Sequence, residues 1–90
     1  MKRRSRARIV YELLRTLDKS GPQPPTRLAT LLGLSYDRLR VILEELEKRG
    51  YVALEKDGRR QDAYITTQGR RALTTLSRAL RMLEELGLEP

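Results

Sequence analysis

The hydrophobic residues of this 90-residue chain recur at helical spacing up to Gly50 and at every second position in the segments directly after it. This change of period limits the fold more than any other feature, because it places a hairpin directly behind a run of helices. Before Gly50 the spacing predicts three helices, at residues 5–19, 26–32 and 36–49. After Gly50 the pattern predicts strands at 51–55 and 62–66, a turn at 56–60 between them, and a last helix at 68–86.

Two interruptions separate the predicted helices. Residues 20–25 are rich in Pro and Gly, which do not continue a helix. The segment Gly33-Leu34-Ser35 is typical of a tight turn, in which Gly33 ends one helix and Ser35 caps the next. Two helices joined by such a turn and followed at once by a hairpin predict a winged helix-turn-helix.

The predicted fold class is therefore mainly α with a small β-hairpin. Its core must be aliphatic, since the aromatic residues are four Tyr only. The residues expected to face inward are Ile9, Val10, Leu13, Leu14 and Leu17 in the first helix, Leu28, Leu31 and Leu32 in the second, and Leu39, Ile42, Leu43 and Leu46 in the third.

The chain contains no Cys and no His. Their absence removes disulfides, thiolate nucleophiles, imidazole bases and nearly every type of zinc site. We therefore expect no enzymatic activity, no metal, no cofactor and no small-molecule ligand. No segment approaches the roughly 20 apolar residues of a membrane span, and the basic N-terminus lacks the apolar segment of a secretion signal. A cytoplasmic protein is expected.

The net charge of +7 is unevenly distributed along the chain. Residues 1–20 and 58–83 each carry +5 and residues 21–43 carry +2, whereas residues 44–57 and 84–90 carry −2 and −3. Of the 19 basic residues 15 are Arg, which suits bidentate contacts but is equally typical of a GC-rich or heat-loving genome. The segregation of charge favours a surface that faces a polyanion.

The predicted order of helices and hairpin indicates how such a surface meets duplex DNA. The start of the third helix enters the major groove, the hairpin turn reaches the adjacent minor groove, and the basic N-terminal arm lies along phosphates. The predicted DNA-binding residues are Lys2, Arg3, Arg4, Arg6, Arg27, Ser35, Tyr36, Arg38, Arg40, Arg59 and Arg60. The alternative is that these cations only solvate the surface, and that Arg38 and Arg40 pair with acidic residues one helical turn later.

The last helix carries two apolar rows, although one row is enough to cover the core of its own domain. The rows consist of Leu73, Leu76, Leu80 and Leu83 and of Ala72, Ala79 and Leu86. We therefore expect residues 1–66 to form the DNA-binding domain and residues 67–90 to form a dimerisation helix. The predicted dimer interface consists of Leu73, Leu76, Ala79, Leu80, Leu83 and Leu86. A monomer is the alternative.

Five short segments carry a family resemblance: KRRSR at 2–6, TRL at 26–28, LSY at 34–36, EKRGY at 47–51 and ITTQG at 65–69. Together they resemble the archaeal ten-kilodalton winged-helix DNA-binding proteins, a group with chromatin-like and regulator-like members. The resemblance implies a homodimer joined through the C-terminal helices. This sequence departs from the group in a last helix that looks shorter and in a longer wing loop.

The leading hypothesis is a homodimeric winged-helix protein that binds double-stranded DNA, either as a transcriptional regulator or as a nucleoid-associated chromatin-type protein. The alternative is a docking module of a transcription or replication assembly, in which the third helix meets protein. Glu44, Glu45 and Glu47 favour the docking module, whereas the basic start of that helix favours DNA. Tyr51 and Tyr64 are expected to pack rather than to stack on bases, which argues against a single-strand binder.

Overall fold

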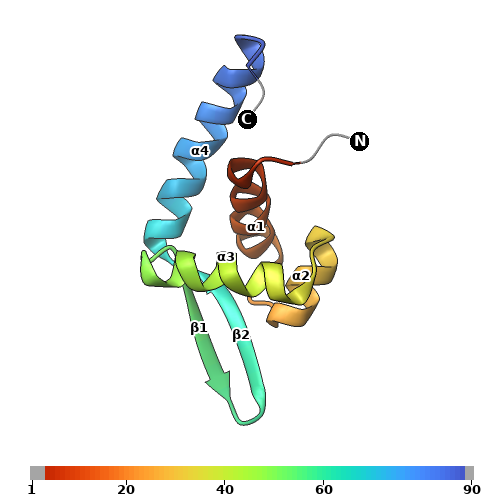
Figure 1. Cartoon of the computed structure of the whole chain (residues 1–90). Coiled ribbons are helices and arrows are strands. Elements are labelled where there is room, and N and C mark those ends of the chain that lie inside the picture. The colour runs from red at the N-terminus through yellow and green to blue at the C-terminus, as the bar shows by residue number, and fades with distance from the viewer. Residues whose placement is uncertain (1–3, 89–90) are drawn as a thin grey trace.

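The computed structural model describes residues 4–88, which form four helices and one hairpin. The elements are α1 (Arg6–Ser20), α2 (Pro25–Leu32), α3 (Tyr36–Lys48), β1 (Val52–Asp57), β2 (Arg60–Ile65) and α4 (Thr67–Glu85). Figure 1 shows α1, α2 and α3 packed together, with the hairpin projecting from one end and the C-terminal half of α4 from the other. This order confirms the predicted mainly α fold with a small β-hairpin.

Hydroxyl side chains begin three of the helices. The side-chain oxygens of Ser5, Ser35 and Thr66 each accept a hydrogen bond from the backbone N–H three residues later, at 3.0 to 3.2 Å. Each bond satisfies one of the N–H groups that the first turn of a helix leaves without a partner. In α2 the first position is Pro25, which lacks an N–H and loses nothing there.

The hydrophobic core lies between α1, α2, α3 and the base of the hairpin. Its buried residues are Ile9, Leu13, Leu14, Leu17, Leu28, Ala29, Leu32, Leu39, Ile42, Leu43, Leu46, Val52, Ala63 and Ile65. The prediction for α2 was wrong at Leu31, which is 50% exposed. The buried stripe of this short helix is formed by Leu28, Ala29 and Leu32. Each residue points in a direction fixed by its position along the helix, and the direction of Leu31 lies outside this stripe.

The wing, residues 52–65, has longer strands and a shorter turn than predicted. β1 and β2 pair antiparallel along their whole length, which leaves only Gly58 and Arg59 between them. Gly58 has a φ of +62°, and no described residue other than glycine has a positive φ. Glycine at the first central position makes this a type II′ turn, whose twist matches that of the strands. Arg59 and Arg60 therefore lie at the end of a regular hairpin rather than in a long loop.

The Pro-rich connection between α1 and α2 also joins the sheet. The backbone N–H of Gln23 donates to the carbonyl of Ala63 at 2.9 Å, and the N–H of Ala63 donates back to the carbonyl of Gln23 at 2.8 Å. This exchange is the hydrogen-bonded pair of an antiparallel ladder. It attaches the base of the wing to the α1–α2 connection, a contact that the sequence does not predict because Pro22 and Pro24 indicate only a break.

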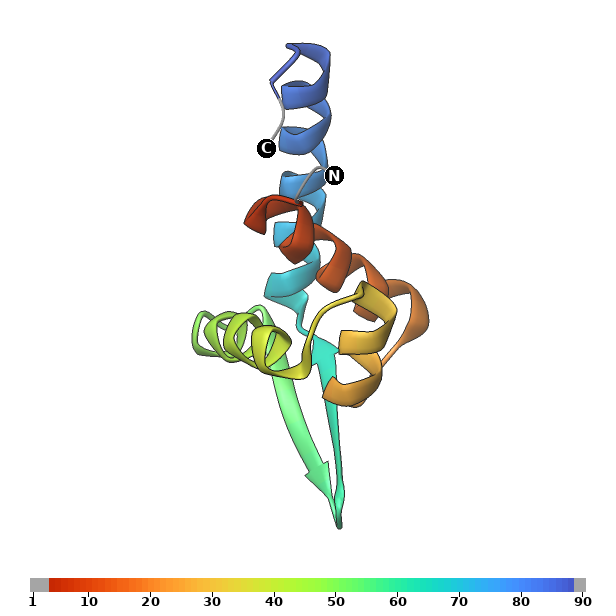
Figure 2. The same cartoon turned by 45° about the vertical axis from the view of Figure 1, so that its right-hand side comes forward.

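Helices α1 and α4 lie antiparallel against each other. Arg8 pairs with Glu84 at 2.7 Å at one end of the pair, and Asp18 pairs with Arg70 at 3.3 Å at the other. Figure 2 shows α4 continuing past the start of α1, so that its C-terminal half stands away from the rest of the molecule. No helix within residues 4–88 has both the length and the apolar character needed to cross a bilayer.

Candidate nucleic-acid interface

The turn before α3 fixes this helix on the surface of the molecule. Gly33 ends α2 in the left-handed conformation, with a φ of +67°. The backbone N–H of Leu34 then donates to the carbonyl of Ala29 at 2.9 Å, a bond that commonly closes a helix end at glycine. The side chain of Leu34 packs against the core. The sequence therefore predicted the role of Gly33 correctly.

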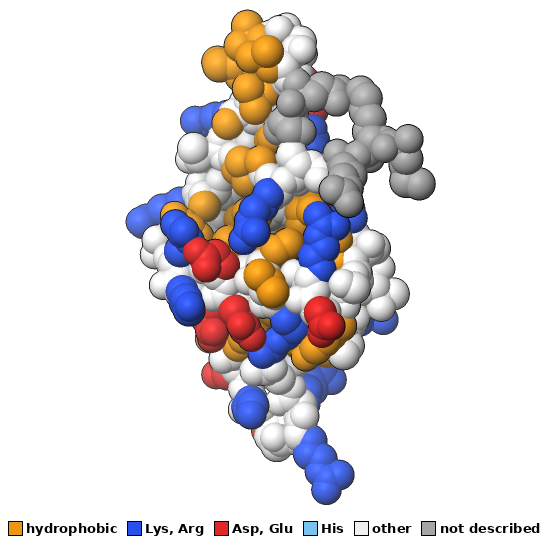
Figure 3. Space-filling model, viewed as in Figure 1, with side chains coloured by type: hydrophobic (Ala, Val, Ile, Leu, Met, Phe, Trp, Pro, Cys, Tyr) orange, Lys and Arg blue, Asp and Glu red, His pale blue; other side chains and the backbone are white. Residues whose placement is uncertain are grey.

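The outward face of α3 is exposed along its length and has a mixed charge. Asp37, Val41, Glu44 and Lys48 follow one another at helical spacing on this face. Val41 is 63% exposed. The whole helix carries four carboxylates and three cations, a net charge of −1. Figure 3 shows the same mixture, with Asp and Glu side chains between Lys and Arg across the middle of the molecule.

Three of the predicted DNA contacts lie together at the start of α3. Tyr36 is 46% exposed, and Arg38 is exposed and forms no ion pair within residues 4–88. The hydroxyl of Ser35 already accepts the N–H of Arg38 at 3.2 Å. It can therefore still donate its own proton to a phosphate oxygen while it caps the helix.

Arg40 connects α3 to the wing. Its Nη1 donates to Oε1 of Gln61 in β2 at 3.3 Å, and its Nη2 pairs with Oε1 of Glu44 at 3.0 Å. The guanidinium carbon lies 6.0 Å from the centre of the Tyr36 ring, within the range of a cation–π contact. The alternative of pairing along the helix thus holds for Arg40, and the sequence gives no sign of the contact with Gln61.

The tip of the wing is basic. Lys56 and Arg59 are exposed, and neither forms an ion pair within the described part of the chain. Arg60 is also exposed, but its Nε pairs with Oδ2 of Asp62 at 3.0 Å. Figure 3 shows Lys and Arg side chains at the end of the hairpin. Arg59 is therefore the predicted wing contact whose guanidinium forms no ion pair among the described residues.

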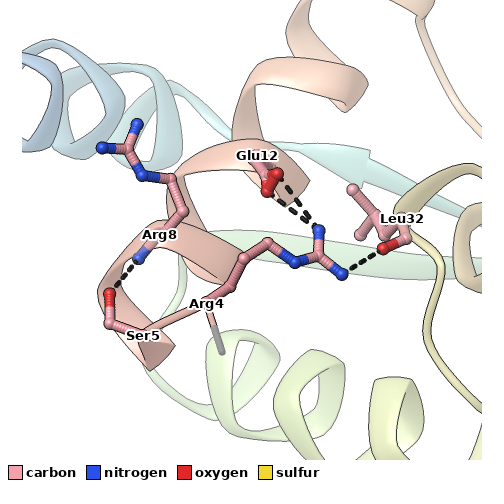
Figure 4. A network of polar contacts seen from close by, with 5 residues as sticks. All are labelled: Arg4, Ser5, Arg8, Glu12 and Leu32. Atoms are coloured by element: carbon pink, nitrogen blue, oxygen red, sulfur yellow. Dashed lines mark hydrogen bonds and ion pairs between the residues drawn. The ribbon is translucent and has the colours of Figure 1, made fainter. Parts of the chain in front are cut away.

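Arg4 lies in a different environment from the other predicted contacts. Its Nη1 donates to both carboxylate oxygens of Glu12, at 2.9 and 3.1 Å, and its Nη2 donates to the backbone carbonyl of Leu32 (Figure 4). A cation at the last carbonyls of a helix is favourable, so Arg4 links the start of the chain to α1 and to the end of α2. The sequence shows only a cluster of basic residues here.

The remaining predicted contacts are Arg6 and Arg27, which are exposed at the starts of α1 and α2. Lys2 and Arg3 fall outside the described residues. The structure thus brings together the start of α3 and β2, through the contact of Arg40 with Gln61. It does not place Arg4 among free surface cations.

The acidic half of α3 is partly neutralised by basic residues. Arg49 donates to Oε1 of Glu45 from Nη2 at 2.8 Å and from Nε at 3.0 Å. These hydrogen bonds, followed by the charges of Arg49, Lys48 and Arg6, lower the pKa of Glu45 below its usual value. Glu45 therefore stays ionised, and Arg49 offsets the repulsion that its carboxylate would exert on a phosphate.

The residues predicted for dimerisation occupy three kinds of environment. Leu80 is buried within the chain at 3% exposure. Leu73, Leu76 and Leu83 are half-buried, whereas Ala79 and Leu86 are exposed. Beside them an open apolar groove runs between α1 and α4, lined by Val10, Leu14, Leu46, Tyr51, Ala72, Leu76 and Ala79 among others. The structure therefore separates Leu80, which is buried within the chain, from apolar surface that no described residue covers.

A helix-turn-helix whose second helix is exposed beside a two-stranded wing defines the class of winged-helix domains. The chain belongs to the winged helix-turn-helix family, whose sequence profile matches residues 3–84. No curated protein matches the chain in sequence. The family and fold predicted from the sequence are confirmed.

Solved structures share this fold. Sso10a-2, a DNA-binding protein from Sulfolobus solfataricus, is similar with a TM-score of 0.84 and 23% identity, over 92% of this chain and 85% of that protein. A probable transcriptional regulator from Pseudomonas aeruginosa is similar with a TM-score of 0.79 and 26% identity, over 87% of this chain and 61% of that regulator. Sco5413, a MarR family transcriptional regulator from Streptomyces coelicolor, has a TM-score of 0.74 and 26% identity, over 83% of this chain and 54% of that protein. The chain therefore has the fold of winged-helix transcriptional regulators, and it spans less than two thirds of the last two.

Proposed function

We propose that the protein binds double-stranded DNA through α3 and the wing, as a homodimeric transcriptional regulator or chromatin-type protein. The observation that carries the proposal is the exposed start of α3, where Arg38 has no ion pair within residues 4–88. The wing next to it carries Arg59 at its tip. Further support comes from the fold that the chain shares with Sso10a-2, a DNA-binding protein.

In this proposal the first two turns of α3 enter the major groove. Arg38 donates two hydrogen bonds to a guanine edge or contacts a phosphate. Val41, which is 63% exposed, suits the methyl group of a thymine. Arg40 fixes the distance between α3 and β2 through Gln61, so that the helix and the wing meet the duplex together. Glu44 would be repelled by phosphates, which limits how far α3 enters.

Homodimerisation is the second part of the proposal. The apolar groove and the exposed side chains of Met82, Leu86 and Leu88 leave apolar surface on α4 and beside it. A second copy would cover this surface, and two copies would present two α3 helices to successive stretches of duplex. The protein is also proposed to lack enzymatic activity and to be a cytoplasmic, nucleoid-associated protein.

A docking module in a transcription or replication assembly is the second candidate. It is favoured by the net charge of −1 on α3 and by the exposure of Val41 in the middle of this helix. Both features suit a protein surface at least as well as a DNA groove. Under this candidate, substitutions of Val41 weaken binding to a protein partner, and duplex DNA is bound weakly at every salt concentration.

The test is a titration of a fluorescent random-sequence duplex at several salt concentrations. If α3 and the wing contact phosphates, the logarithm of the affinity falls steeply with the logarithm of the salt concentration, and Arg38→Ala and Arg59→Ala each reduce the slope by about one. Arg8→Ala is the matched control, because it removes a cation that is already paired with Glu84. If wild type shows no binding to random DNA and selects no sequence from a random pool, the proposal is wrong.

A further inference from the structure

The two sides of the α1–α4 pair differ in chemistry. One side is the apolar groove, which includes Val10, Ala72 and Leu76. The other side is a second open groove lined by Tyr11, Arg15, Asp18, Lys19, Leu73, Thr74, Ser77, Arg78 and Arg81, here called the basic groove. None of its lining residues belongs to α3 or to the wing. The basic groove is therefore separate from the proposed DNA-binding surface.

We propose that the basic groove binds the phosphate backbone of nucleic acid, as a second contact surface beside that of α3 and the wing. The inference rests on the proposed DNA binding, because it assigns the same class of ligand. This backbone belongs either to the flank of the duplex that is bound at α3 or to a second duplex.

The charges in the basic groove carry the inference. Arg15, Lys19, Arg78 and Arg81 are exposed, and none of them forms an ion pair within residues 4–88. The single carboxylate of the groove, Asp18, already pairs with Arg70 at 3.3 Å. Four cations therefore face one groove whose single carboxylate already has another partner.

The four cations of the basic groove differ from the helix cations that have acidic partners. Arg38, at the proposed DNA-binding surface, is likewise an exposed helix cation without an ion pair within residues 4–88, whereas Arg49 pairs with Glu45 and Arg40 with Glu44. In the basic groove, by contrast, Arg15 and Lys19 are one helical turn apart with like charge, a spacing that destabilises a helix. A polyanion removes this repulsion, and a surface selected only for solubility would avoid it.

The length and the hydroxyl groups of the groove suit a nucleic-acid strand. The groove lies along the stretch of α1 between Arg8, which pairs with Glu84, and Asp18, which pairs with Arg70. The rise of α1 from Arg8 to Asp18 is roughly 15 Å, along which one strand of a duplex presents about four phosphates. Half-buried Tyr11 and Ser77 add hydroxyl donors for phosphate oxygens.

A second copy of the chain is not the occupant of this groove. A two-fold axis would bring the same four cations against themselves, and like charges across an interface oppose association. The apolar groove on the other side of the α1–α4 pair is lined by a single cation, Arg71, so this barrier is much smaller there. Dimerisation and binding of a second backbone therefore use opposite sides of the same two helices.

The test compares Arg78→Gln/Arg81→Gln with Arg4→Gln/Arg8→Gln. Both double variants lose two positive charges, but only the first pair lies in the basic groove, whereas Arg4 and Arg8 already have acidic partners. Affinity for one labelled duplex is measured against salt. Energy transfer between a donor-labelled and an acceptor-labelled duplex is measured in the same samples, and circular dichroism checks that each variant is folded.

If the flank of the same duplex occupies the groove, Arg78→Gln/Arg81→Gln lowers the salt slope on a long duplex by about two. If a second duplex occupies it, the slope on one duplex stays and the energy transfer between duplexes is lost. The inference is overturned if the two double variants behave alike in both measurements. If wild type binds no DNA at all, the proposed function itself fails, and this outcome differs from a failure of the groove alone.

Discussion

At the scale of single residues, Gly69 is required by packing although it lies inside a helix. A Cβ added at this position would collide with the carbonyl oxygen of Tyr51 and lie 2.7 Å from Cγ1 of Ile65. Alanine normally stabilises a helix relative to glycine by about 1 kcal/mol. Here we expect Gly69→Ala to lower the free energy of unfolding by about 1–3 kcal/mol, because α4 must move away from the base of the wing. Urea denaturation measures this change, and Thr75→Ala at an exposed site of α4 is the control. An increase in stability would show that the helix shifts at little cost.

Arg4 tests whether a basic residue of the N-terminal segment serves the fold or DNA. Because its guanidinium bonds Glu12 and the carbonyl of Leu32, Arg4→Ala is expected to lower the free energy of unfolding by about 1 kcal/mol. The salt slope of DNA binding should stay unchanged, whereas Arg38→Ala should change the slope and not the stability. A double-mutant cycle with Glu12→Ala measures the coupling. If the stability is unchanged and the salt slope of DNA binding falls by about one, Arg4 contacts DNA instead of stabilising the fold.

These two residues show what the sequence predicts at this scale. The inward positions of α3 and the capping role of Ser35 follow from a local period and a local hydrogen bond, so both were predictable. The partners of Arg4 and the collision at Gly69 arise from segments far apart in the chain. No local pattern encodes them, and charge alone made Arg4 resemble a DNA contact.

At the scale of elements, the wing depends on a contact outside its own hairpin. Replacing Gln23 by Pro removes the N–H that donates to the carbonyl of Ala63 at 2.9 Å. We expect Gln23→Pro to cost about 1–3 kcal/mol, since the carbonyl of a buried residue loses its partner, and to increase hydrogen exchange at the amide of Ala63. Gln23→Ala is the matched control, because it keeps both backbone bonds. Equal losses in the two variants would assign the effect to the side chain instead.

The two strands of the hairpin were predicted from the sequence, but their lengths were not. The alternation of residues at 51–55 and 62–66 predicted the existence of two strands, but it ended the first strand too early and began the second too late. Gly58 and Arg59 form a two-residue turn, so the pairing continues through charged residues that have no alternation. Turn geometry, rather than hydrophobicity, sets the length of the wing. The turn predicted at 56–60 was too long for this reason, whereas the basic tip was predicted from the sequence.

At the scale of the whole molecule, the chemistry of α4 differs from one side to another in a way that its sequence shows only in part. The two apolar rows predicted a surface for a second copy. The structure uses Leu80 within the protomer and leaves Leu86 exposed. The pairing of α1 with α4 is a tertiary contact, so the sequence could reveal neither groove between these helices.

The proposed dimer can be tested by substituting the exposed residues Ala79 and Leu86 in one variant and the buried residue Leu80 in another. Ala79→Glu/Leu86→Glu places charge on exposed apolar surface, so we expect a folded monomer in sedimentation analysis. Leu80→Ala should instead lower the free energy of unfolding by about 2–5 kcal/mol at every concentration, because it opens a cavity inside the protomer. The midpoint of thermal unfolding should rise with the concentration of wild type and not with that of the monomeric variant, since association stabilises only the folded state. Sedimentation of wild type as a monomer, together with a concentration-independent midpoint, would rule out the dimer and leave the apolar groove to another partner.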